Sequence, residues 1–202
     1  YDIIDWVEPC WVFDTATAQY SGRSLWRRPK FTLKIWQTDW RYWPAFEPHH
    51  YLKLPRMIAS YNYVGTVDGE RVAHLAVSTT PGMREARACR LVVMPEWQGA
   101  GIGMRFLNAV CELYRTGKGH LPYPSPTLFH TTHPGLCAAL RRDPAWRQLS
   151  AALHGASKAR SLASVIRSRQ GRGGSKIEAG YGGHFRAIQG FQYYGANDAK
   201  TA

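Results

Sequence analysis

The sequence predicts a mixed α+β domain, because strand and helix patterns alternate through its central part. Asp68-Gly69 separates two apolar runs, a signature of a β-hairpin closed by a type I′ turn. A third apolar run, residues 87–94, ends in a glycine-rich turn. Residues 102–115 follow, and their apolar side chains recur at helical spacing. We therefore expect a sheet flanked by helices.

The elements before the hairpin are less regular. Residues 1–30 show no long periodicity and are expected to form an extension that wraps the core. A first strand is predicted at residues 31–36, followed by a short helix with Thr38 or Asp39 as its N-cap and an interruption at Pro44. Tryptophans cluster around this helix and predict a packed aromatic wall.

After the helix at 102–115, the pattern predicts a strand at residues 127–132 and a helix at 133–142. A last strand is predicted within residues 184–195. The composition between these parts changes, and residues of about 150–180 read as a basic insertion.

Length and composition indicate one globular domain, residues 31–202, after the extension. The chain has 202 residues, of which 45% are hydrophobic and 20% charged, so it can bury a core. No apolar run approaches the roughly 20 residues that span a bilayer, so no membrane segment is expected. The four cysteines are scattered without a CxxC pair, which favours reduced thiols and a cytoplasmic protein.

The net charge of +12 favours a polyanionic partner, since cationic side chains release counterions from nucleic acid. Basic residues concentrate in residues 157–176, where no acidic residue occurs. Five of them are the predicted phosphate contacts: Arg160, Arg167, Arg169, Arg172 and Lys176. Tyr181, Phe185 and Phe191 would stack on exposed bases. The alternative is a solvated basic loop or a surface that docks another protein domain.

The glycines at 99, 101 and 103 lie between an apolar strand and an amphipathic helix. Backbone N–H groups at a helix start lack intrahelical partners and lie at the positive end of the helix dipole. Glycine has no Cβ and lets the backbone approach an anion. The turn is therefore predicted to bind a phosphate, and the alternative is a helix cap that binds no ligand.

The run Val93-x-Pro95-x-x-Gln98-Gly99-Ala100-Gly101-Ile102-Gly103 resembles the acyl-CoA signature Q/R-x-x-G-x-G/A of the GNAT acyltransferase superfamily. The order of the predicted elements resembles that family as well. The resemblance implies a GNAT fold: a central, mostly antiparallel twisted sheet with flanking helices and a V-shaped acyl-CoA cleft.

The same resemblance implies acetyl-CoA or another acyl-CoA as cofactor. The backbone of one segment would hold its pyrophosphate: Gln98, Gly99, Ala100, Gly101, Ile102, Gly103 and Met104. The backbone of Leu91, Val92 and Val93 would run beside the pantetheine arm, as an extra strand would.

Shorter strings carry a second resemblance. FEPHHYL at 46–52, the glycine-turn run, and FHTTHPG at 129–135 followed by DPAWR at 143–147 are similar to GNAT-like domains attached to ABC-type ATPases. The His-His-Tyr element is also similar to the phage Mom proteins, GNAT relatives that modify adenine in DNA. Mom proteins lack as clear a CoA signature as this chain has. This resemblance implies an ATPase domain as partner.

Many GNAT enzymes use a Glu near the central strand as base and a Tyr on a later helix as acid. This sequence has neither, and Glu85 before the strand is one of the nearest carboxylates. His130 and His133 are the predicted proton carriers, because histidine titrates near neutrality. His50 and Tyr51 are expected on the acceptor side, or else in a turn packed on the aromatic wall.

A metal site is an alternative, since His130 and His133 with His49 or His50 would supply enough nitrogen ligands if the fold brought them together. Their spacing alone does not indicate one, and no metal is expected. The predicted function is acyl-CoA-dependent N-acylation of a nucleic-acid base or modified nucleotide, with a base in duplex DNA flipped out or already unpaired. The alternatives are acetylation of a protein or small-molecule amine, and a non-catalytic nucleic-acid-binding module on a GNAT scaffold.

Overall fold

The structure is a computed structural model of the 202-residue chain. It describes residues 11–16, 18–22, 31–51, 57, 60–79, 84–152 and 187–195.

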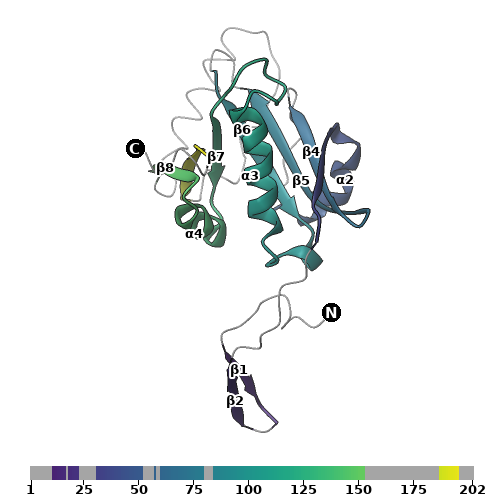
Figure 1. The fold of residues 1–202 in the computed structure, drawn as a ribbon, viewed down its shortest axis with the longest axis vertical. Helices are drawn as coiled ribbons and strands as arrows, with labels where there is room; N and C mark the ends of the chain where they lie inside the picture. The colour runs from purple at the N-terminus through teal and green to yellow at the C-terminus, as the bar shows by residue number, and fades with distance from the viewer. Residues whose placement is uncertain are drawn as a thin grey trace, which may run out of the picture.

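Two sheets form among these residues (Figure 1). The small one pairs β1 (Trp11–Asp14) with β2 (Gln19–Gly22). The large one has the order β3-β4-β5-β6-β7-β9-β8. Its strands are β3 (Lys34–Thr38), β4 (Tyr61–Val67), β5 (Glu70–Thr79), β6 (Ala86–Val93), β7 (Thr127–Thr131), β8 (Trp146–Ala152) and β9 (Ile188–Tyr193). All neighbouring pairs are antiparallel except β6 and β7, which are parallel. The predicted mostly antiparallel sheet is confirmed.

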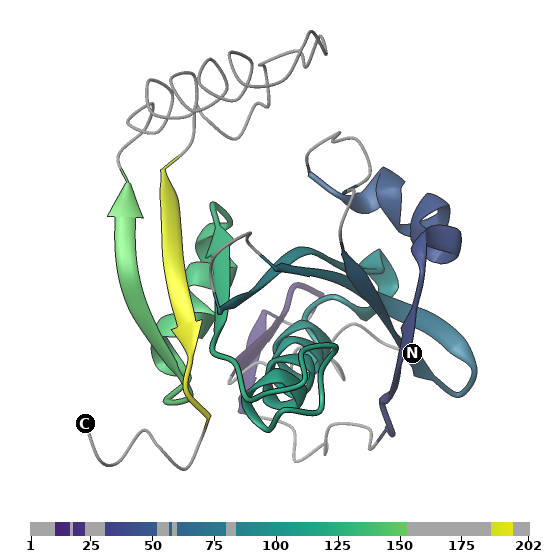
Figure 2. The same cartoon turned by 90° about the horizontal axis from the view of Figure 1, so that it is seen from above.

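The helices lie on both faces of the large sheet (Figure 2). Three short elements follow β3: the 3-10 helix η1 (Trp40–Tyr42), α2 (Trp43–Phe46) and the 3-10 helix η2 (Glu47–His49). They cover the face opposite α3 (Ile102–Arg115), which follows the 3-10 helix η3 (Pro95–Trp97). The last helix is α4 (Pro134–Arg142). Asp39 caps η1, because its side chain accepts a hydrogen bond from the Arg41 N–H group at 2.7 Å.

The predicted hairpin is confirmed by its backbone. Asp68 and Gly69 link β4 to β5 with φ values of 49° and 86°. These positive values are what a type I′ turn requires, and Asp and Gly adopt them at low cost.

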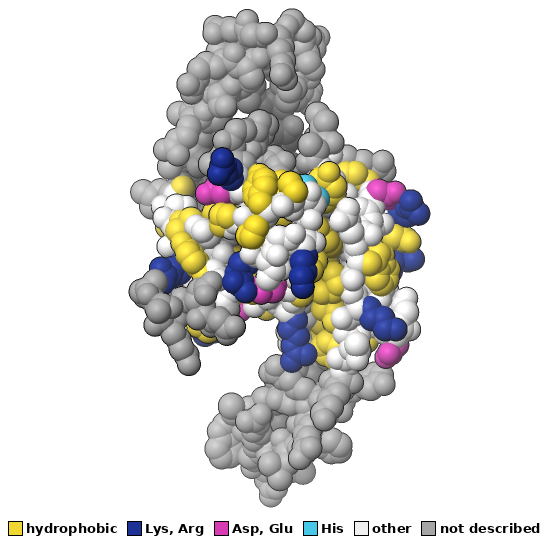
Figure 3. Space-filling model, turned by 45° about the horizontal axis from the view of Figure 1, so that its top comes forward, with side chains coloured by type: hydrophobic (Ala, Val, Ile, Leu, Met, Phe, Trp, Pro, Cys, Tyr) yellow, Lys and Arg dark blue, Asp and Glu magenta, His cyan; other side chains and the backbone are white. Residues whose placement is uncertain are grey.

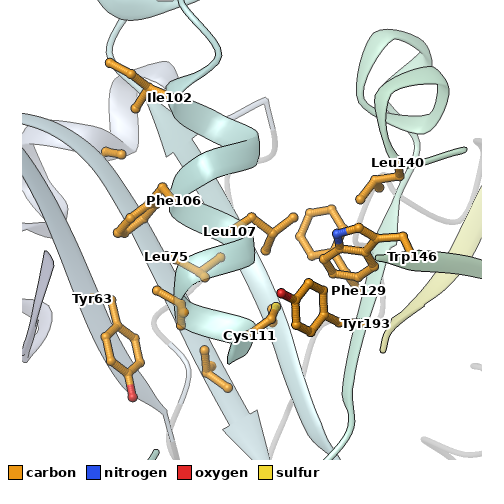
Figure 4. Packing of buried hydrophobic residues seen from close by; sticks show 14 of the residues in the cluster. Tyr63, Leu75, Ile102, Phe106, Leu107, Cys111, Phe129, Leu140, Trp146 and Tyr193 are labelled. Carbon is orange, nitrogen blue, oxygen red and sulfur yellow. The ribbon is translucent and has the colours of Figure 1, made fainter. Parts of the chain in front are cut away.

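The main core lies between α3, α4 and the sheet (Figure 4). Phe106, Leu107 and Cys111 on α3 are fully buried, and this spacing is the periodicity that predicts the helix. Leu140 on α4 is fully buried as well. A core of this kind fixes α3 against β5, β6 and β7, so the position of its N-terminus is set by packing.

A second cluster covers the other face of the sheet. The rings of Trp40, Trp43 and Phe46 surround the buried His74 of β5 at centroid distances of 5.9, 5.0 and 5.5 Å. This confirms the predicted aromatic wall around Trp40 and Trp43, whereas Trp36 remains 39% exposed.

Two strand assignments differ from the sequence-based expectation. β8 was not predicted, because four consecutive residues of this edge strand are exposed and no period-two apolar pattern marks it. The N-terminal extension, expected to wrap the core, contains a separate two-stranded sheet within its described residues. The predicted interruption of the short helix at Pro44 is wrong, because Pro44 lies in the first turn of α2, where proline is tolerated. Most of the segment after β3 is 3-10 helix.

The buried His74 makes stability depend on pH. Burial among aromatic rings lowers its pKa from 6.5 to about 4, and the Arg90 charge also disfavours the protonated ring. Between these values the unfolded chain binds the proton more tightly, so the free energy of unfolding falls as pH drops from 6.5 towards 4. The expected loss is about 3 kcal/mol. Denaturant unfolding of wild type and His74→Leu at several pH values checks this. The variant should lose that part of the pH dependence, whereas His49→Leu, at an exposed site, should keep it.

Candidate active site

The site begins where two parallel strands stop pairing. β6 and β7 pair only from Ala86 with Thr127 to Ala88 with Phe129. β6 then continues to Val93 and β7 to Thr131, without further pairing between them. A cavity of about 340 Å³ lies at this divergence, lined by residues of β5, β6, β7 and β9 and of the segment after η2. The predicted V-shaped opening corresponds to this divergence.

A β-bulge shapes the β6 wall of the cavity. His74 pairs with Val92 and Ala76 with Cys89, so Arg90 and Leu91 together oppose the single residue Leu75. Arg90 has a φ of 54°, a value that L-residues other than Asn and Asp rarely adopt. As a result both Cys89 and Arg90 line the cavity.

His130 of β7 lies on the same wall. Its predecessor Phe129 pairs with Ala88, which puts His130 beside Cys89 at the point where pairing ends. Burial lowers the pKa of His130, and the charge of Arg87 lowers it further, so its imidazole is neutral near pH 7. The buried Nδ1 has no hydrogen-bond partner among the described residues. A neutral ring of this kind can accept a proton.

The position of the His130 ring depends on a glycine of the next strand. Gly190 of β9 is the registered partner of His130. A Cβ at this position would lie 3.0 Å from His130 Nε2 and 2.5 Å from Ser150 Oγ. The absence of a side chain at 190 therefore leaves room for the imidazole.

The structure brings two of the predicted clusters together, since His50 and Tyr51 line the same cavity as His130. His50 is buried and packs edge-on against Trp43, with ring centroids 5.6 Å apart. Tyr51 is 49% exposed, and its ring lies 4.9 Å from that of His50. His50 thus packs on the aromatic wall as expected for a turn there, and both residues also line the cavity.

The other two predicted catalytic residues lie elsewhere. His133 is the N-cap of α4, and its Nδ1 accepts a hydrogen bond from the Leu136 N–H group at 3.1 Å. Glu85 precedes β6 at the end away from the glycine turn. Neither residue lines the cavity.

The glycine turn has the geometry of an anion site. Gln98 anchors it by donating from Nε2 to the Val93 carbonyl at 3.0 Å. Gly99 and Gly101 have φ values of 85° and 78°, and a Cβ at either would meet nothing within 4 Å, so this surface of the turn is open. The first helical bond of α3 runs from the Arg105 N–H group to the Gly101 carbonyl. The N–H groups at 102–104 thus precede the hydrogen-bond ladder of the helix and are oriented for an anion.

Gly103, in the same turn, affects how closely α3 packs against β6. A Cβ there would lie 3.3 Å from Val93 Cγ2, so a glycine permits the close approach of α3 to β6. Leu91, Val92 and Val93 lie on the stretch of β6 that has no pairing with β7. The residues of the turn and strand therefore fit a phosphate followed by an extended chain.

Arg87, Cys89 and Arg90 are cavity residues that sequence reasoning missed. The available signal was the pair of arginines that interrupts an otherwise apolar strand. Met57 and Ile188 also line the cavity, and nothing in the local sequence marks them.

The predicted nucleic-acid contacts Arg160, Arg167, Arg169, Arg172 and Lys176 lie outside the described residues, as do Tyr181 and Phe185. Phe191 is fully buried in the core, so the prediction that it stacks on bases is wrong. Lys and Arg side chains are spread over the described part of the face in Figure 3 rather than gathered in one stripe.

Within the described ranges, no three His, Cys, Asp or Glu side chains are grouped so as to hold a metal ion. Of the helices described, none is long and apolar enough to cross a membrane.

The sheet, the glycine turn and the cavity can be compared with known families. The model of the acetyltransferase (GNAT) family matches residues 32–121 of this chain. This stretch runs from just before β3 through the glycine turn and α3.

Solved structures show the same fold. The ribosomal-protein-S18-alanine N-acetyltransferase from Escherichia coli is 14% identical with a TM-score of 0.50, covering 80% of this chain and 93% of its own. The IAA acetyltransferase from Bacillus cereus is 16% identical with a TM-score of 0.54, covering 80% and 99%. A Bacillus subtilis acetyltransferase in complex with CoA is 8% identical with a TM-score of 0.52, covering 82% and 99%. No curated protein matches the chain significantly in sequence.

The cap formed by His133 predicts a purely structural effect. His133→Ala should lower the free energy of unfolding by about 1 kcal/mol, because the α4 N-terminus loses its side-chain acceptor. His133→Asn should retain most of the stability, since an asparagine oxygen also caps. Thermal or denaturant unfolding measures both. Equal losses in the two variants would contradict the capping role.

Proposed function

We propose that this protein is an N-acyltransferase that uses acetyl-CoA as donor and binds its acceptor in the cavity beside His130. The observation that carries the proposal is the position of two features at the divergence of β6 and β7. An anion-binding turn follows β6, and a cavity holds the neutral His130 of β7. The family match supports the donor, and the CoA complex of the Bacillus subtilis neighbour is consistent with it.

The residues that would hold the donor are those of the turn and the adjoining strand. Backbone N–H groups from Gln98 to Met104 would bind the pyrophosphate, and the backbone of Leu91 to Val93 would flank the pantetheine arm. When bound, acetyl-CoA supplies a thioester carbonyl that an amine can attack. The C–N bond to the acceptor forms and the C–S bond breaks, so the amine loses a proton and the thiolate gains one.

His130 is the residue that we assign to the amine proton. It is half-buried, neutral and located where the free stretches of β6 and β7 begin. Tyr51 is the group that we assign to returning a proton to the thiolate, because it is a phenol that lines the same cavity. His133 is excluded from this assignment, since its Nδ1 is engaged in the helix cap.

The acceptor predicted from the sequence, a nucleic-acid base or modified nucleotide, depends on the net charge of +12 and on five basic residues outside the described ranges. The resemblance to domains attached to ABC-type ATPases and to Mom proteins stays a prediction in the same way.

The turn can be tested with two glycines of matched conformation. Gly101→Asp should abolish CoA binding, because the carboxylate would repel the pyrophosphate and occupy its place. Gly69→Asp is the control, since Gly69 also has a positive φ and open space but lies in the β4–β5 hairpin. Calorimetric titration with CoA measures both. Equal loss of binding in the two variants would show that backbone strain alone is responsible.

The role of His130 predicts a rate effect and a pH effect. His130→Gln should lower kcat by about 10²- to 10⁴-fold, the usual contribution of a general base. Since the pKa of His130 is lowered, wild-type kcat/KM should fall only as pH drops well below 6.5. Steady-state assays of CoA release across pH measure both. A wild-type profile unchanged in His130→Gln would contradict the assignment.

A further inference from the structure

We propose that the acceptor is a small amine that also carries a carboxylate or phosphate, and that Arg87 and Arg90 bind this anionic group. The inference rests on the proposed function, because it identifies the substrate class of the same cavity.

The register of the sheet gathers the relevant side chains on one face. Arg87 pairs with Ser78 of β5 on one side and with Leu128 of β7 on the other. Paired residues in a sheet project to the same face, and residues two apart along a strand do so too. Ser78, Arg87, Cys89 and His130 therefore form a row across three strands, and all four line the cavity.

The cavity is positively charged at neutral pH. Its described lining includes the guanidinium groups of Arg87 and Arg90 and no Asp or Glu. The charges act inside the cavity: Arg87 lowers the pKa of His130, and both arginines oppose the effect of burial on the Cys89 thiol. Since the histidine is neutral, the two arginines set the sign of the local potential.

Arg90 is held in a fixed position by its surroundings. Its guanidinium lies 5.3 Å from the Trp40 ring centroid and 5.7 Å from that of Trp43, and the bulge aims the side chain at the cavity wall. A half-buried guanidinium on an aromatic platform is less screened than a surface arginine and pre-organised for a carboxylate or phosphate. Arg87, by contrast, is exposed and can reach an anion that enters from solvent.

Two buried polar atoms indicate that a polar ligand completes this wall. His130 Nδ1 and Thr132 Oγ1 have no hydrogen-bond partner among the described residues, and both residues line the cavity. Buried polar atoms are normally satisfied, so such a pair next to two arginines marks a binding surface. The volume of about 340 Å³ is at the small end of ligand pockets and suits a metabolite-sized acceptor.

The experiment compares amines that differ in charge. Acetyl transfer to 4-aminobutyrate and O-phosphoethanolamine is measured beside transfer to n-butylamine, ethanolamine, spermidine and a single-stranded oligonucleotide. The anionic amines should have kcat/KM values at least tenfold above those of the neutral amines, because charge-assisted hydrogen bonds form only with them. The two acids separate a carboxylate from a phosphate preference.

Substitutions of single arginines test whether the preference for anionic amines arises in the cavity. Arg87→Gln should remove most of the preference, because it should raise KM for the anionic amines about tenfold more than KM for the neutral amines. Arg87→Lys should restore part of it. Arg71→Gln is the matched control, since Arg71 is another exposed strand arginine but lies over Tyr42 and outside the cavity lining. This control should leave the preference intact.

Several outcomes would overturn the inference without touching the proposed function: equal transfer to neutral and anionic amines, preference for spermidine, or transfer to the oligonucleotide alone. If no amine is acetylated, the proposed function fails. The anion site is then tested by measuring whether the anionic amines bind. Titration of O-phosphoethanolamine and 4-aminobutyrate into wild type and Arg87→Gln then decides. Binding that is weakened in the variant supports the site, and absence of binding by wild type overturns it.

Discussion

The short pairing of β6 with β7, only three residue pairs long, determines where the candidate site lies. In a parallel pair the strands begin at the same edge, and if pairing stops early both carboxyl-terminal stretches remain available to a ligand. Here the free stretch of β6 leads directly into the glycine turn, and the free end of β7 carries His130. The glycine turn and His130 are therefore both placed by the end of β6–β7 pairing, although they are far apart in sequence.

The β-bulge opposite Leu75 determines which β6 side chains face the cavity at this divergence. An extra residue in β6 changes which side chains face the cavity, so that Cys89 and Arg90 both reach it. The cost is a non-glycine residue at positive φ, and the aromatic cluster of Trp40 and Trp43 lies against the Arg90 side chain. Strained backbone of this type is found where surrounding packing enforces it, often at functional sites. The short helical segment after β3 thus stabilises the site as well as covering the sheet.

Local patterns in the sequence were enough to predict α3, the β4–β5 hairpin and β7, since each is marked by periodicity or by a turn pair. The same patterns located the glycine turn and the histidine at the end of β7. Arg90 could not be placed, because strict alternation would put it on the same face as Ala88 and only the bulge alters this. The approach of His50 to His130 joins elements far apart along the chain, and β8 is an exposed edge strand; neither leaves a local pattern.

The pairing of β8 with β9 has a topological consequence for the segment between them. Ala152 and Ile188 are registered partners, and Ile188 lines the cavity. The segment 153–187 therefore begins and ends at one pair of registered residues, Ala152 and Ile188. The entropic cost of closing a loop between adjacent ends rises only slowly with the length of the loop. The fold can thus accept longer, shorter or exchanged segments between β8 and β9, next to the cavity-lining Ile188, without any change in the glycine turn after β6.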